Sequence, residues 1–255
     1  AAVFPMEVIS VGIMYYAALV PCVFSAFIGE RISIFMGVRT LTAPYPVEEV
    51  PNFYGIAWGK AILLAICFAF AGALFCVMLH IFEKQLKKWF QNPYLRVFVG
   101  GVTVVLLWKI TGTDTYLGLG GGTIAQSFAE PQKLWVFLLK ILFTCITLCS
   151  GFKGGEIVPS LFIGATFGSA LAPIFGLPVD ICAACGMVGV FCAVTNSPIS
   201  SLLIAFELFG FRGASYYLIA VSISYAVSGY YGLYKDQTIV YSKYKAKYIN
   251  RHTRF

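Results

Sequence analysis

One polar turn between two apolar runs contains the residues most able to do chemistry. Residues 151–159 read Gly-Phe-Lys-Gly-Gly-Glu-Ile-Val-Pro, and the apolar Ser-Leu-Phe-Ile-Gly-Ala follows. Pro159 lacks an N–H and suits the first turn of a helix. The amides from Glu156 to Ser160 would then lie at the positive end of that helix, which attracts anions without a formal charge. From composition alone, a plain loop between two membrane spans explains the turn equally well.

The composition indicates what surrounds this turn. The chain has 255 residues, of which 59% are hydrophobic and 11% charged, and its mean hydropathy is +0.83. This is too apolar for a soluble globular domain. Uncharged windows long enough to span a bilayer recur at residues 8–29, 61–79, 157–179, 181–206 and 213–234. We therefore expect an all-α polytopic membrane protein.

The positive charge follows the expected topology and does not indicate a nucleic-acid partner. The net charge is +7. The basic residues gather in one short segment between helices and in the C-terminal tail. They are Lys84, Lys87, Lys88, Lys243, Lys245, Lys247, Arg251 and Arg254. By the positive-inside rule these segments are cytoplasmic, which places the C-terminus inside.

Neither a cofactor nor a catalytic centre is expected. The eight cysteines fall inside apolar runs, where free cysteine behaves as a small hydrophobe. The Cys182/Cys185 pair has the CxxC spacing but lacks a second ligand pair, and His80 and His252 lie far apart in the chain. With no Ser/His, paired-Asp or zinc-ligand set, an intramembrane enzyme is disfavoured.

The helices expected from the apolar runs and the prolines are partly broken. They cover residues 8–31 (bent at Pro21), 58–90, 93–110, 124–128, 131–150, 161–175, 180–195, 198–209 and 213–230. Residues 38–58 form a polar connection that reads as an external loop. The helix at 198–209 is too short to cross a bilayer alone. Discontinuous helices of this kind are typical of transporters whose binding sites lie at the membrane midplane.

The central turn resembles an anion-binding motif of the CLC family of chloride channels and transporters. That motif, in the second half of the family's chains, usually reads Gly-x-Phe-x-Pro, and residues 155–159 read Gly-Glu-Ile-Val-Pro. The bend at residues 117–120, Leu-Gly-Leu-Gly, is similar to another bend of the family. The resemblance covers essentially the whole chain. It implies a CLC-like inverted-repeat fold with tilted and discontinuous helices, which in the family forms homodimers.

A short echo suggests how the chain divides. Residues 1–8, Ala-Ala-Val-Phe-Pro-Met-Glu-Val, resemble residues 202–208, Leu-Leu-Ile-Ala-Phe-Glu-Leu, where an apolar helix also ends in a buried-looking glutamate. In the CLC family the last helix of each repeat ends in such a residue. The resemblance therefore assigns residues 1–8 to the tail of the last helix of the first repeat. It assigns residues 9–234 to the transmembrane helices of the second repeat, and 235–255 to a C-terminal, cytoplasmic-facing helix and tail.

The resemblance also implies the site residues. The anion would be bound by Gly155, Glu156, Ile157, Val158 and Tyr234. Tyr234 fills the place of a family tyrosine whose hydroxyl faces the anion, although without the resemblance it reads as an interfacial residue. Glu156 stands where many members have an apolar residue. An ionisable group at membrane depth is a candidate for proton coupling; equally, Glu156 could face a water-filled vestibule or be neutralised by Lys153.

Two departures favour the fluoride-type branch of the family, whose members exchange fluoride for protons. Glu156 lies in the central turn, and Val8 replaces the second glutamate of the chloride antiporters. Val158 lacks a hydroxyl that fluoride-type members carry nearby, so fluoride is preferred over chloride only slightly. We expect halide transport, as proton-coupled antiport, in a bacterial inner membrane. The alternatives are a passive channel, a non-conducting half-transporter, and an organic-solute transporter on another fold.

Overall fold

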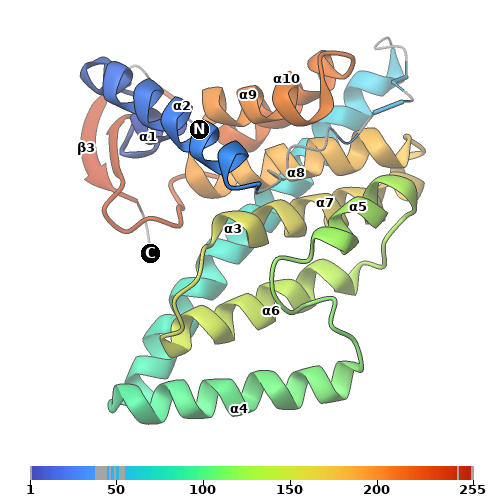
Figure 1. Cartoon of the computed structure of the whole chain (residues 1–255). Coiled ribbons are helices and arrows are strands. Elements are labelled where there is room, and N and C mark those ends of the chain that lie inside the picture. Colours follow the sequence, from blue (N-terminus) through green and yellow to red (C-terminus); the bar gives the residue numbers. More distant parts are fainter. Residues whose placement is uncertain are drawn as a thin grey trace.

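The computed structural model describes residues 2–37, 45, 47–48, 50–51, 55–245 and 247–253. Its elements (Figure 1) are, in order, α1 (Phe4–Val8), β1 (Ser10–Val11), η1 (Tyr16–Ala18), α2 (Leu19–Phe35), α3 (Ile56–Trp89), α4 (Pro93–Thr111), α5 (Gly121–Ala129), α6 (Trp135–Ser150), α7 (Ile157–Phe175), α8 (Val179–Thr195), α9 (Pro198–Phe209), α10 (Ala214–Val227), β2 (Thr238–Tyr241) and β3 (Tyr248–His252). The external loop expected at residues 38–58 lies largely outside the described residues.

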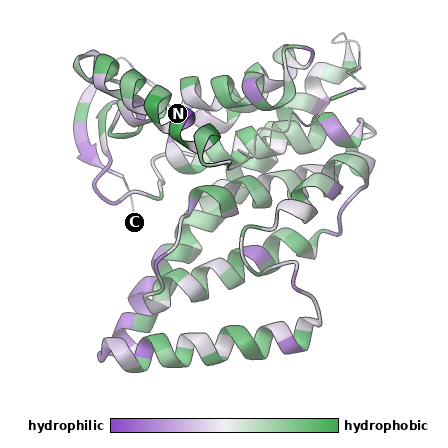
Figure 2. Cartoon of the chain, viewed as in Figure 1, coloured by the Kyte–Doolittle hydropathy of each residue, from purple (hydrophilic) through white to green (hydrophobic). Residues whose placement is uncertain are grey.

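The helices form successive layers crossed by one long helix. Figure 1 shows α4, α6, α7 and α8 following one another, with α3 crossing them, and α3 contacts α6, α7, α8 and α10. Within the described part of the chain, four helices are long and apolar enough to cross a membrane: Tyr16–Phe35, α3, α4 and α7. The expected polytopic helical fold is confirmed. Figure 2 shows hydrophilic residues gathered at the end of α3 that meets α4.

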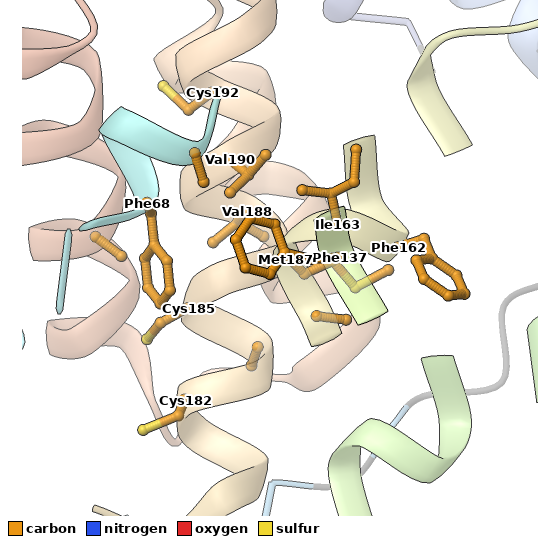
Figure 3. Close-up of a cluster of buried hydrophobic side chains, with 14 of the residues drawn as sticks. Phe68, Phe137, Phe162, Ile163, Cys182, Cys185, Met187, Val188, Val190 and Cys192 are labelled. Atoms are coloured by element: carbon orange, nitrogen blue, oxygen red, sulfur yellow. The ribbon is translucent and has the colours of Figure 1, made fainter. Parts of the chain in front are cut away.

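Helix α8 lies at the centre of the core. Every residue from Ile181 to Thr195 is buried, and Figure 3 shows Phe68 of α3 on one side of this helix and Phe162 and Ile163 of α7 on the other. Glycines let α7 and α8 meet backbone to backbone: a Cβ added to Gly186 would lie 2.2 Å from the carbonyl oxygen of Gly164. The small residues of these helices therefore serve packing, as expected for helices in lipid.

We expect Gly186→Ala to lower the free energy of unfolding by about 1–3 kcal/mol, because the added methyl group overpacks the contact between α7 and α8. Thermal unfolding in detergent measures the change. Gly122→Ala is the matched control, since Gly122 also lies in a helix and has no atom within 4 Å of an added Cβ. Equal melting temperatures for the two variants would show that the contact is not tight.

The prediction of a helix at residues 8–31 was wrong for the first part of that range. The chain leaves α1 after Val8, forms β1, and turns at Gly12, whose φ is +95°. The long helix begins only at Leu19, so Pro21 lies in its first turn and does not bend it. The backbone of residues 10–11 pairs with β2, and this distant pairing ends the helix.

The C-terminal helix expected within residues 235–255 was also wrong. The described residues there form β2 and β3 in a three-stranded sheet of order β1-β2-β3, in which β1 and β2 are parallel and β2 and β3 antiparallel. The sequence of β2 is Thr-Ile-Val-Tyr. Its β-branched and aromatic side chains fit a pleated, half-buried surface better than a helix.

The breaks in the second half of the chain were predicted correctly. α8 ends before Asn196, whose φ of 57° is left-handed, and α9 begins at Pro198. The N-terminus of α9 is capped by Glu7, which is buried. Its carboxylate accepts hydrogen bonds from the Ile199 amide at 2.9 Å and from the Ser200 amide at 2.8 Å and hydroxyl at 2.6 Å. Glu207, which the echo predicted to be buried as well, is exposed.

A buried amide network joins the two ends of the chain to α8. The Gln237 side chain, 2% exposed, donates to the carbonyls of Val8 and Thr195, each at 2.7 Å. It accepts a hydrogen bond from Asn196 at 2.9 Å. Buried polar groups of this kind are costly when left unpaired, so the network fixes the segment after α10 against the ends of α1 and α8.

Lys243 extends this network. Its ammonium donates to the Asn196 side chain, to the Tyr225 carbonyl at 3.0 Å and to the Ser228 hydroxyl at 3.1 Å. Burial lowers the pKa of Lys243 to about 8. No carboxylate pairs with it among the described residues, so it is held by the neutral oxygens near the ends of α8 and α10.

Candidate functional site

The central turn leads into a helix that has no side-chain cap. Gly151, with φ of +111°, ends α6, and Glu156 is the N-cap of α7, which has no side-chain cap. The carbonyl of Glu156 accepts from the Ser160 amide at 3.2 Å. Among the described residues, no acceptor takes the amides of Ile157 and Val158. The start of α7 therefore keeps donors for a ligand.

Tyr234 is held at the same site by the segment after α10. The Leu233 amide donates to the carbonyl of Val194 at 3.0 Å. The carbonyl of Tyr234 itself accepts from the Gln237 amide at 3.2 Å and from the Thr253 hydroxyl at 2.9 Å. The backbone of Tyr234 is thus fixed, and its side chain is half-buried.

Glu156 and Tyr234 line one cavity, which we call the turn cavity. Its volume is about 450 Å³. Its walls come from α3, α4, the end of α6, the turn and the segment after α10. The lining residues are Leu79, Glu83, Lys87, Arg96, Leu148, Cys149, Gly151, Glu156, Leu233, Tyr234, Lys235 and Asp236. Two residues 78 positions apart (234 − 156) therefore line one cavity.

The charges of the turn cavity balance formally. Three basic residues, Lys87, Arg96 and Lys235, face three acidic ones, Glu83, Glu156 and Asp236. At this balance the cavity carries no formal net charge.

The Tyr234 hydroxyl is a neutral donor at this site. Burial raises the pKa of the Tyr234 phenol, and the negative charge of Glu156 raises it further. The hydroxyl thus stays protonated at physiological pH. Because it carries no full positive charge, it can bind an anion and still release it.

The other predicted site residues do not line the turn cavity. Gly155 lines a different cavity of about 330 Å³, together with Gly154, Pro159 and the buried Lys140. Ile157 and Val158 are half-buried in the first turn of α7. Lys153 is exposed and forms no ion pair with Glu156 among the described residues, so neutralisation by Lys153 finds no support.

Several charged residues of the turn cavity were missed from the sequence. Lys87 was read only as a topological marker, and Glu83, Arg96 and Lys235 were given no role. Glu83 and Lys87 have the i, i+4 spacing of a helical ion pair, and Lys235 follows Tyr234 directly. The spacing indicates the ion pair between Glu83 and Lys87. Only the fold shows that Lys235 lies beside α3.

Comparisons with known proteins show the family of the chain. The sequence model of the family described as "Voltage gated chloride channel" matches residues 1–229. The chain belongs to this family, the CLC family. The resemblance seen in the central turn is confirmed. A "Chloride/fluoride channel protein" of Pseudomonas syringae pv. tomato is 36% identical over 249 residues, which are 95% of this chain and 55% of that CLC protein.

A solved CLC structure is similar along most of the chain. It is described as the "Crystal structure of a CLC-type fluoride/proton antiporter". The TM-score is 0.87 at 31% identity, over 92% of this chain and 59% of that one. The chain therefore spans less than two thirds of the length of either of these CLC relatives.

Proposed function

We propose that the protein exchanges fluoride or chloride for protons across a membrane, and that both bind in the turn cavity. One observation carries the proposal: Glu156, at the uncapped start of α7, and Tyr234 line the same cavity. Donors and a titratable group at the same place are what coupled movement of an anion and a proton requires. The CLC relatives, described as a chloride/fluoride channel and a fluoride/proton antiporter, support it.

The anion would exchange its hydration shell for neutral donors. The Tyr234 hydroxyl and the amides of Ile157 and Val158 are such donors, and the dipole of α7 adds to them. The basic residues lining the cavity are each offset by an acidic one, so the anion is not trapped by an uncompensated charge. Anion binding is thus strong enough for selectivity and weak enough for release.

The proton would be carried by Glu156. Its side chain is half-buried at the wall of the cavity, which Glu83 also lines. Burial and a like charge both favour the protonated form of a carboxyl group. Glu156 can therefore take up a proton on one side of the membrane and give it up on the other.

We favour fluoride over chloride as the anion. Both relatives name fluoride, and a carboxyl in the central turn is the feature by which this chain resembles the fluoride-type branch. We also propose that the protein forms homodimers in the bacterial inner membrane with its C-terminus in the cytoplasm. A passive channel is the second candidate, because the Pseudomonas syringae relative is described as a channel protein.

We expect Tyr234→Phe to weaken anion binding about tenfold, because a hydrogen bond to a charged group contributes about 1.5–3 kcal/mol. Titration calorimetry with fluoride and with chloride, on the full-length protein carrying this sequence, measures the dissociation constants. Tyr94→Phe is the control, since Tyr94 is 87% exposed and lies outside the turn cavity. If the Tyr234→Phe isotherm matches that of the wild type, Tyr234 is an interfacial residue and the anion site lies elsewhere.

A further inference from the structure

A second cavity adjoins the turn cavity, and we call it the lysine cavity. Its volume is about 630 Å³. Lys84 and His80 from α3 and Tyr231 line only the lysine cavity, whereas three charged residues line both cavities. The shared residues are Glu83, Lys87 and Lys235. A charged cluster therefore forms the wall between the lysine cavity and the site that holds Glu156.

Glu83 is the centre of this wall. One carboxylate oxygen accepts from Lys87, one helical turn further along α3, at 2.6 Å, and the other is paired with Lys235. The Glu83 side chain is 20% exposed, against 56% for Lys87 and 49% for Lys235. Ion pairs with such exposed lysines contribute little to stability. Stability therefore does not explain the cluster well. A better explanation is the charge that it places in the cavity lined by Glu156.

We propose that Glu83 and Lys235 are positioning residues that set the pH range over which Glu156 exchanges its proton. Glu83 supplies a negative charge that favours the protonated form of Glu156, and Lys235 supplies a positive charge that opposes it. Because Lys235 follows Tyr234, the same ion pair holds the tyrosine segment against α3. This inference rests on the function proposed above for the turn cavity.

The electrostatic argument depends on proximity and on low screening. Both charges act on Glu156, Glu83 in one sense and Lys235 in the other. Their effect is larger in a half-buried cavity than in bulk water. The other charged and titratable groups facing the two cavities are Lys84, Lys87 and His80 on α3, Arg96 on α4, Cys149 on α6, and Tyr231, Tyr234 and Asp236 near the C-terminus.

The test is the pH dependence of proton flux in liposomes containing the full-length protein. We expect Glu83→Gln to shift the midpoint of the profile toward acid by about one pH unit, a tenfold change in proton concentration, because Glu156 loses a repelling charge. Lys235→Met removes an attracting charge and should shift the midpoint toward alkali. A role that is only structural would lower the flux at all pH values and would not move the two midpoints in opposite directions.

Two further variants make the test specific. Glu83→Asp keeps the charge and should restore the wild-type midpoint. Lys87→Met removes the other ammonium that pairs with Glu83, and the Lys87 side chain is more exposed than that of Lys235. The alkaline shift of the midpoint should therefore be smaller than in Lys235→Met. Unmoved midpoints in Glu83→Gln and Lys235→Met, with coupled flux intact in the wild type, would overturn this inference alone. Absence of coupled flux in the wild type would instead overturn the proposed function.

Discussion

Glu156→Gln should lower proton flux at least about 100-fold while anion flux stays within about threefold of the wild type. Proton transfer by a positioned side chain is worth about 10²–10⁴-fold in rate, and glutamine cannot take up a proton. The amide keeps the size of the carboxyl, so the turn and the start of α7 should keep their shape. A fluoride electrode and a pH electrode reading one liposome suspension measure both fluxes at once.

Glu207→Gln is the matched control for this experiment. Glu207 is exposed at the end of α9 and does not line the turn cavity, so its removal should leave the ratio of protons to anions unchanged. The same ratio in wild type and Glu156→Gln would remove Glu156 from the proton path. Loss of both fluxes in a folded Glu156→Gln protein would assign the residue to anion binding as well as to proton transfer.

Glu7→Ala should be the most destabilising of the substitutions considered, by about 3 kcal/mol. Glu7 links α1 to α9, and its carboxylate takes up two amides and a hydroxyl at the start of α9. Hydrogen bonds to charged groups contribute about 1.5–3 kcal/mol each, and a buried donor left unpaired costs more. By the scaling for chains of this size, the melting temperature should fall by about 6–12 °C.

Two variants distinguish the effect of losing this cap from the effect of losing a carboxylate charge. Glu207→Ala removes a carboxylate at the exposed end of the same helix and should change the melting temperature little. Glu7→Gln keeps one of the two acceptor oxygens, so its melting temperature should lie between those of the wild type and Glu7→Ala. Similar melting temperatures for Glu7→Ala and Glu207→Ala would show that the buried cap does not hold α9.

Much of the helical frame could be predicted from local sequence. The apolar run of α3, Pro93 at the start of α4, and the break at residues 196–198 are each set by nearby residues, and the structure has them where they were expected. The prediction failed where pairing with a distant part of the backbone determines the secondary structure. Residues 10–11 form a strand because they pair with residues 238–239 across the whole chain, and no local pattern contains that partner.

The site residues likewise fall into those that local sequence indicates and those that depend on the fold. The central turn was found from its own glycines, glutamate and proline, and Tyr234 through its resemblance to a family position; the structure brings Glu156 and Tyr234 to one cavity. The partners of Glu83 could be half predicted, because Lys87 is four residues away on the same helix. Lys235 could not, since its meeting with Glu83 depends on how the segment after α10 returns to α3.

The most direct test of the central claim is a gradient experiment on the wild-type full-length protein in sealed liposomes. With a fluoride gradient imposed, no proton gradient and the membrane voltage clamped, fluoride should run down its gradient while protons move in the opposite direction and build a pH difference. Fluoride flux without proton movement would identify a passive channel and contradict the exchange. No flux of either fluoride or chloride would contradict the anion site itself.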